Sequence, residues 1–362
     1  MEKMRIRRCR QCGFAYWLAR SLEWHDNGTI TSRFREDYRT LIIEADFLSE
    51  IFKAIEEAIG ATIGHVVFEA QRRASKDVID MNLARIRWAI RHVPGLYRGV
   101  ILYFNRLASW CGQAYSRTVR NDPRGPSQAI IRNPFNRDLM AAIVTGALES
   151  LFEVPYDHHW EKRGADDVIV VEPTGEHPEI CERLAYSTPA PTGGGRAFEL
   201  CPSCGAPHRL SVLDWDPDRG TVTDTRRGIR VVFLEIYTTN VVLRELVREL
   251  GEDIVPVIVE AQRNFSLTHI GTLRSSGDAR PAEKDRKAFM EEALDTIALY
   301  GQGNPTVLEN GEKMLRISVE NPFNEYVLAG HLSALYELLE GERAKVEWEF
   351  PHPSTAVFTL TA

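Results

Sequence analysis

The chain lacks the features of a membrane-spanning or secreted protein. No apolar run approaches the ~20 residues that a membrane-spanning helix needs, and the charged beginning of the sequence has no apolar core of the kind found in signal peptides. An excess of basic residues is also missing: the net charge is -7, which argues against a broad nucleic-acid-binding face. We therefore expect a cytoplasmic protein without membrane or nucleic-acid partners.

Recognisable catalytic motifs are missing as well. The sequence has no glycine-rich phosphate loop, no Gly-x-Ser-x-Gly turn and no His-Glu-x-x-His helix. We assign no catalytic residue, although an enzyme or an assembly factor in aromatic or tetrapyrrole metabolism stays open as an alternative. With 44% hydrophobic and 26% charged residues, the composition is that of an ordinary globular protein.

The chain contains the same series of motifs twice. Cys-Arg-Gln-Cys-Gly at residues 9–13 returns as Cys-Pro-Ser-Cys-Gly at residues 201–205. Two longer-range motifs recur in the same order: Glu-Ala-Gln-Arg at 69–72 and 260–263, and Asn-Pro-Phe-Asn at 133–136 and 321–324. The slowly drifting offset predicts duplication of a whole domain, since a solenoid would repeat every ~20–50 residues.

Composition divides the chain into two repeats and a linker. Residues 172–197 contain four prolines and a Gly-Gly-Gly run, so we interpret them as a linker between a first repeat at 1–171 and a second at 198–362. The expected fold is α+β, with helices packed on a small antiparallel sheet in each repeat and a pseudo-twofold axis between the repeats. The third helix of each repeat is predicted at residues 78–92 and 282–299.

Four of the six cysteines occur in the two Cys-x-x-Cys-Gly segments. In such a turn, backbone N–H groups point toward sulfur, and the glycine removes the steric cost of the turn. Four thiolates are a complete tetrahedral set for structural zinc, so we predict a zinc site that joins the repeats. Iron, a redox pair and free thiols are the alternatives. The predicted ligands are Cys9, Cys12, Cys201 and Cys204.

The first repeat carries an aromatic stretch that the second repeat does not match. Concentrated aromatic side chains suit an apolar pocket for a small hydrophobic ligand, and ordinary core is the alternative. His65 lies one helical turn before Glu69, so this pair is a candidate polar anchor, with a salt bridge from Glu69 to Arg72 as the alternative. In the second repeat, the region equivalent to the end of the aromatic stretch is Gly-Gln-Gly at residues 301–303, and we expect it to tolerate substitution. The candidate ligand-binding residues are Tyr97, Tyr103, Phe104, Trp110, His65 and Glu69.

Short segments of the second repeat resemble a known family. They are Gly-Thr-Val at 220–222, Arg-Val-Val-Phe-Leu at 230–234, Val-Glu-Asn-Pro-Phe at 319–323, and Trp348. Together they resemble the vinyl-4-reductase domain and the related sensor domains of phenol- and xylene-responsive activators. The resemblance implies an α+β fold, a small hydrophobic ligand enclosed by helices, and often a bound zinc. It implies a role in hydrocarbon sensing or as an accessory protein in tetrapyrrole synthesis, and we transfer no metal ligand from it.

These observations lead to one functional expectation. We expect a zinc-containing binding or regulatory protein that holds a hydrophobic or aromatic molecule in its first repeat. A scaffold subunit of a larger protein complex is a further alternative, and a homodimer is compatible with either role.

Overall fold

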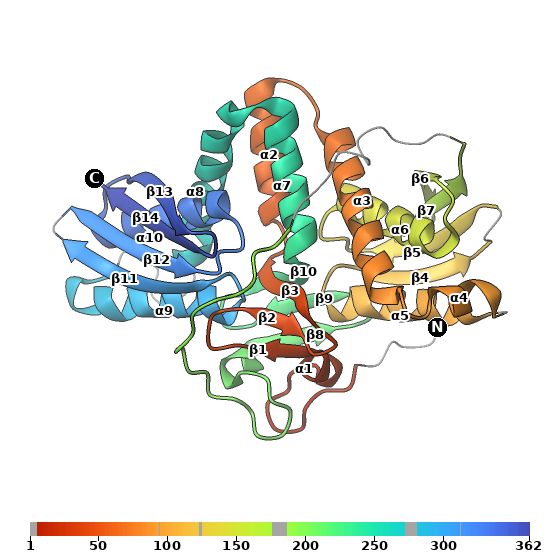
Figure 1. Ribbon diagram of the computed structural model, residues 1–362, viewed down its shortest axis with the longest axis horizontal. Helices are drawn as coiled ribbons and strands as arrows, with labels where there is room; N and C mark the ends of the chain where they lie inside the picture. Colours follow the sequence, from red (N-terminus) through yellow and green to blue (C-terminus); the bar gives the residue numbers. More distant parts are fainter. Residues whose placement is uncertain (1–5, 94, 123–124, 176–186, 272–280, 312) are drawn as a thin grey trace.

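The computed structural model describes residues 6–93, 95–122, 125–175, 187–271, 281–311 and 313–362. It has an α+β fold, as the sequence predicts, but its helices pack on three antiparallel sheets instead of one sheet in each repeat (Figure 1). The helices up to residue 173 are α1 Tyr16–Ser21, α2 Phe47–Ile59, α3 Gly64–Leu83, α4 Arg87–His92, α5 Leu96–Trp110 and α6 Arg137–Phe152. The strands up to residue 173 are β1 Leu22–Trp24, β2 Ile30–Ser32, β3 Arg35–Glu44, β4 Tyr115–Arg120, β5 Ser127–Arg132, β6 Tyr156–Arg163 and β7 Asp166–Pro173.

Elements of the second half follow a similar order. Its strands are β8 Leu213–Asp216, β9 Thr221–Asp224, β10 Ile229–Glu235, β11 Asn304–Gly311, β12 Met314–Glu320, β13 Lys345–His352 and β14 Thr355–Thr361. Its α-helices are α7 Ile236–Leu250, α8 Val255–Gly271, α9 Arg286–Leu299 and α10 Glu325–Glu340. Short 3-10 turns span His208–Val212, Glu252–Ile254 and Glu283–Asp285. Each half therefore begins with a hairpin and ends with a strand pair, the order that the sequence motifs predict.

Strands from both halves share one central sheet. Its order is β1-β2-β3-β10-β9-β8, and β3 pairs with β10 in antiparallel register, from Glu44 opposite Val231 to Thr40 opposite Glu235. Two wings flank the central helices α2 and α7, one built on the sheet β4-β5-β7-β6 and the other on β11-β12-β14-β13 (Figure 1). Backbone hydrogen bonds of a continuous sheet therefore join the halves, in addition to any bond through the cysteines.

Each hairpin at the base of the molecule packs against the wing of the other half. A β-carbon on Gly28, in the β1–β2 turn, would lie 2.3 Å from the carbonyl oxygen of Gly303. One on Gly220, in the β8–β9 turn, would lie 1.9 Å from the backbone nitrogen of Tyr115. Both glycines have positive φ, +71° and +66°. The turns therefore need glycine for their conformation and for the close approach of another backbone.

The recurring sequence motifs are structural. Asn136 and Asn324 cap the helices α6 and α10, and each side chain accepts a hydrogen bond from a backbone N–H of the first turn. In the Glu-Ala-Gln-Arg motifs, Arg72 forms a 3.0 Å ion pair with Glu69, and Arg263 pairs with Glu337 of α10. The Asn residues therefore begin helices, and the Arg residues form ion pairs within helices or between them.

One expectation for the middle of each half is wrong. In the first half, α3 continues to Leu83, and the counterpart of α9 is not at residues 78–92 but is α5, the aromatic stretch itself. The Gly-Gln-Gly segment after α9 is tightly packed. A β-carbon on Gly301 would lie 2.8 Å from the carbonyl oxygen of Thr40. We expected this segment to tolerate substitution, but the structure leaves no room for a side chain at Gly301.

Candidate metal centre and ligand cavity

The four predicted ligands meet at the base of the molecule. The sulfur atoms of Cys9, Cys12, Cys201 and Cys204 all lie within 4.8 Å of one another, and all four side chains are buried. Sulfur separations are 3.9 Å between Cys9 and Cys201 and 3.5 Å between Cys12 and Cys204. A tetrahedral metal with bonds of about 2.3 Å to sulfur needs separations of about 3.8 Å. The cluster therefore fits a metal ion, whereas disulfides would need about 2.05 Å.

Both cysteine turns have the same backbone geometry. The N–H of Gly13 donates to the carbonyl of Cys9 at 3.0 Å, and the N–H of Gly205 donates to that of Cys201 at 2.8 Å. Each glycine has positive φ, +76° and +80°. Each half therefore contributes one pair of thiols to the cluster, as expected from the repeated Cys-x-x-Cys-Gly pattern.

Backbone donors favour the charged form of at least one thiol. Burial raises the pKa of Cys9, but the N–H groups of Cys12 and Gln11 outweigh it and bring this pKa to about 6. Burial raises the pKa of Cys12 and of Cys204, and the neighbouring thiols of Cys9 and Cys201 raise both pKa values further. Four thiolates at this spacing repel one another, and a bound cation would remove that cost.

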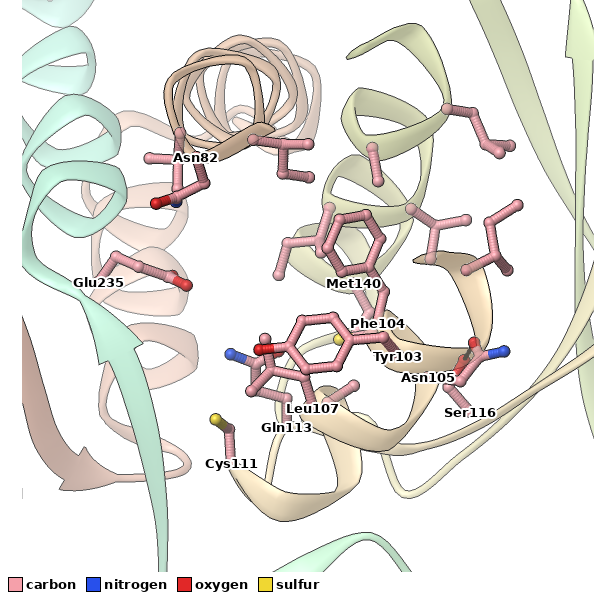
Figure 2. A pocket seen from close by; sticks show the side chains of 18 of the residues that line it. Asn82, Tyr103, Phe104, Asn105, Leu107, Cys111, Gln113, Ser116, Met140 and Glu235 are labelled. Atoms are coloured by element: carbon pink, nitrogen blue, oxygen red, sulfur yellow. Dashed lines mark hydrogen bonds between the residues drawn. The ribbon is translucent and has the colours of Figure 1, made fainter. Parts of the chain in front are cut away.

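A second feature is a large cavity in the wing of the first half. It has a volume of about 450 Å³ and lies among α3, α5, α6, the sheet of that wing and the central strands. Apolar side chains form much of its wall, including Leu83, Phe104, Leu107, Met140 and Leu148. Figure 2 shows the aromatic rings of Tyr103 and Phe104 on α5 beside this space.

A few polar groups interrupt the apolar wall. Glu235 comes from β10 of the other half, and its carboxylate accepts a hydrogen bond of 2.6 Å from the hydroxyl of Tyr38. The thiol of Cys111 also lines the cavity and lies below Glu235 in Figure 2. Burial, followed by the negative charge of Glu235, raises the pKa of Cys111 well above its usual range. The thiol is therefore neutral at pH 7, so it is not poised as a nucleophile.

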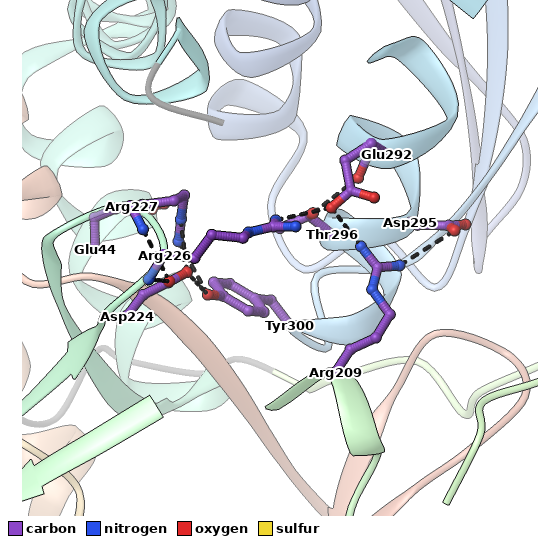
Figure 3. A network of polar contacts seen from close by, with 9 residues as sticks. All are labelled: Glu44, Arg209, Asp224, Arg226, Arg227, Glu292, Asp295, Thr296 and Tyr300. Atoms are coloured by element: carbon purple, nitrogen blue, oxygen red, sulfur yellow. Dashed lines mark hydrogen bonds and ion pairs between the residues drawn. The ribbon is translucent and has the colours of Figure 1, made fainter. Parts of the chain in front are cut away.

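The corresponding region of the second half is nearly filled. Its space is about 20 Å³, lined by Glu44, Arg227, Tyr300 and His331 among others. Arg227 forms ion pairs of 2.7 Å with Glu44 and 2.8 Å with Asp224, and these side chains occupy the interior (Figure 3). The two wings therefore differ in whether this space is open.

Matched hydrogen bonds identify which residues correspond. The N–H of Phe233 donates to the carbonyl of Cys111 at 2.9 Å, and the N–H of Ile42 donates to that of Tyr300 at 2.8 Å. The amide of Gln113 donates to the carbonyl of Phe233 at 3.1 Å, and that of Gln302 donates to the carbonyl of Ile42 at 3.0 Å. Cys111 thus occupies the place of Tyr300, and this difference in side-chain size helps to leave the first cavity open.

The structure brings only part of the predicted ligand set to this cavity. Tyr103 and Phe104 line it, but the other four residues lie outside the lining. His65 is exposed, and Glu69 is ion-paired with Arg72. The ring of Tyr97 contacts Phe152 edge-on, with centroids 5.6 Å apart, and that of Trp110 contacts Trp17 with centroids 6.0 Å apart. We therefore remove His65, Glu69, Tyr97 and Trp110 from the candidate set.

Sequence reasoning missed Tyr38, Cys111 and Glu235. None lies in a recognisable motif, and Glu235 belongs to the half opposite the cavity that it lines. One signal was present in the repeat: a small residue, Cys111, precedes Gly-Gln where the second half has Tyr300 before the same dipeptide. Comparing side-chain sizes between the halves would have pointed to the open space.

Comparison of the chain with protein-family models, with curated proteins and with solved structures finds no match. The resemblance to the vinyl-4-reductase domain therefore stays a prediction from short motifs. In the described part of the chain, no helix combines the length and the apolar character needed to cross a membrane.

Proposed function

We propose that this protein binds a small hydrophobic or aromatic molecule in the cavity of its first half. The observation that carries the proposal is the contrast between the halves. One space measures about 450 Å³ and the matching one about 20 Å³. Small-molecule sites commonly have volumes of about 300–1,000 Å³ and mostly apolar walls. A large apolar void reduces stability by forfeiting packing contacts, so its retention in one half favours a ligand-binding role.

The polar groups of the wall suggest the chemistry of the ligand. The Tyr38–Glu235 pair offers a carboxylate acceptor at the edge of an apolar space. A ligand with an aromatic or aliphatic body and one hydroxyl or amine would bury its body against α5 and α6 and donate to Glu235. Phenols and aromatic amines have this combination of groups, and an unsubstituted hydrocarbon would leave Glu235 without a new partner.

Thermal unfolding in the presence of candidate ligands tests the proposal. We expect phenols, aromatic amines, aromatic hydrocarbons or porphyrins to stabilise the wild type, since ligand at 100 times its Kd contributes about 2.7 kcal/mol. Cys111→Tyr and Ala108→Ile each copy the residue of the filled half, Tyr300 or Ile297, and should abolish this stabilisation. Cys111→Ser keeps the cavity open and should retain it.

Two results would overturn the proposal. One is the absence of stabilisation by every ligand class in the wild type. The other is equal stabilisation of Cys111→Tyr and Ala108→Ile, because both substitutions add side-chain volume to the same space at the end of α5. Circular dichroism of the variants without ligand shows whether each one is folded, so a loss of binding is not mistaken for a loss of structure.

We also propose that the four cysteines hold zinc. The support is the chemistry of the donor set: four buried sulfurs at tetrahedral spacing, supplied in pairs by the two halves. Sulfur-only tetrahedral sites suit zinc, and iron shares the same ligands. Metal analysis of purified protein should find about one zinc per chain and no visible absorption. A coloured iron protein, or a folded protein without metal, would contradict this assignment.

A further inference from the structure

One segment of this acidic protein has only positive charge. Residues 81–120 contain seven arginines and no lysine, aspartate or glutamate, whereas the whole chain has a net charge of -7. They cover the end of α3, the helices α4 and α5, and β4. Within the described residues, Arg85, Arg106 and Arg117 are exposed and form no ion pair. Arg87 and Arg120 form ion pairs with Asp80 and Asp122, so the positive charge that the segment presents comes from its other exposed arginines.

The same segment exposes large apolar side chains. On α5, the exposed positions include Leu96, Gly99, Leu102, Tyr103 and Arg106, which recur at helical spacing along one face. The side chain of Leu102 is 50% exposed. The helix α4 packs against α5 and adds Trp88, which is 70% exposed. Ile86, the residue before α4, is exposed as well. We call this set of exposed apolar and arginine side chains on α4, on α5 and in the turn before α4 the basic apolar face.

The counterpart helix in the second half provides an internal comparison. α9 occupies the place of α5 before the shared Gly-Gln dipeptide. Its exposed positions include Lys287 and Glu291, which form an ion pair, and Lys284 lies just before it. Charges of both signs are the ordinary surface of a soluble helix. The exposed apolar residues of α5 therefore do not follow from the position of the helix in the fold.

We propose that the basic apolar face docks on the surface of an anionic lipid bilayer. Arginines beside exposed Trp, Leu and Ile side chains are the combination by which helices bind at the interface of such membranes. The negative charge of the remaining protein would be repelled by the same surface and would orient this face toward it. The proposal departs from our expectation of no membrane partner, which rested on the absence of a spanning segment.

Docking here would bring the bilayer to the cavity. Tyr103 and Phe34 both line the cavity and are exposed, so they lie where the cavity meets the surface near the basic apolar face. A hydrophobic ligand could then pass from lipid into the cavity. This passage of ligand rests on the proposed function. Docking itself does not require a ligand. The cavity-blocking Ala108→Ile variant should bind vesicles as the wild type does.

Sedimentation with lipid vesicles tests the docking surface. The full chain should sediment with vesicles of phosphatidylserine and phosphatidylcholine, and not with phosphatidylcholine alone, at low salt. Each arginine near an anionic membrane contributes about a fivefold gain in binding, so Arg85→Gln with Arg106→Gln should weaken it about 25-fold. Lys284→Gln with Lys287→Gln removes the same charge from the counterpart helix and should have no effect.

A second pair of variants separates insertion from charge attraction. Trp88→Ala should weaken vesicle binding even at low salt, whereas Phe350→Ala, an exposed aromatic in the second half, should not. The proposal is overturned if the wild type does not sediment with anionic vesicles, or if both lysine and arginine variants lose binding equally. It is also overturned if the wild type self-associates in ultracentrifugation without binding vesicles, and Trp88→Ala abolishes that self-association. The basic apolar face would then bind a second copy of the chain.

Discussion

Replacing Arg227 by methionine should destabilise the second half strongly. The Arg227 side chain is 4% exposed, and it bonds to Glu44, Asp224 and the hydroxyl of Tyr300 at 2.7, 2.8 and 3.0 Å (Figure 3). Methionine would leave two buried carboxylates without their cation. Breaking a buried ion pair by removing one partner costs about 3–5 kcal/mol, because the remaining charge stays desolvated. With an unfolding entropy of about 2.1 cal/mol/K per residue, that corresponds to a decrease in melting temperature of roughly 4–7 °C for this chain.

The pH dependence of this loss distinguishes the ion pairs from simple packing. Burial raises the pKa of Glu44 and Asp224, but Arg227 outweighs it and holds both below their ordinary values. Their contribution to wild-type stability is therefore present above the unfolded pKa values, about 4, and is lost as the pH falls through the folded values. In Arg227→Met, only weaker interactions oppose burial, such as the hydrogen bond from Tyr300 to Asp224. We expect both pKa values to rise, so the variant should lose stability as the pH rises above about 4.

Urea unfolding at pH 7 and near pH 4 measures this effect. The free energy of unfolding of wild type minus that of Arg227→Met should be several kcal/mol at pH 7 and should shrink toward pH 4. Arg226→Met is the matched control, because Arg226 forms a half-exposed pair with Glu292, which is expected to contribute no more than about 1 kcal/mol. A loss no greater than that of the control, or one independent of pH, would show that Arg227 does not stabilise the protein through its ion pairs.

Two further predictions concern the metal centre and the helix packing. Cys12→Ser should lose the bound metal and lower the melting temperature, while Cys111→Ser retains metal. The Cys12→Ser chain should still elute as a compact monomer-sized species in gel filtration, because β3 pairs with β10. Gly146→Ala should destabilise by about 1–3 kcal/mol, since its β-carbon would lie 2.3 Å from the carbonyl oxygen of Arg72. Gly99→Ala, with no atom within 4 Å of its β-carbon, should instead stabilise by up to about 1 kcal/mol. Thermal unfolding of the two alanine variants should give opposite signs, and a Gly146→Ala variant as stable as the wild type would show that packing at Gly146 is not limiting.

Features that depend on neighbouring residues or on a repeated pattern can be read from the sequence without the structure. Asn136 and Asn324 cap helices because a short polar side chain reaches a backbone N–H two or three residues later. Gly60 ends α2 in the left-handed conformation that glycine adopts without steric cost. The meeting of the four cysteines followed from their number and repeated spacing, since two half-sites complete one tetrahedral set.

The position of the open space and the residues that surround it depend on how distant elements pack together. A cavity depends on the sizes of side chains that converge from distant elements, and no local pattern encodes that sum. Glu235 lines the first cavity only because β10 crosses to pair with β3, and Trp110 misses it because its ring lies against Trp17. Gly301 is intolerant of a side chain because Thr40, far away in sequence, lies against it.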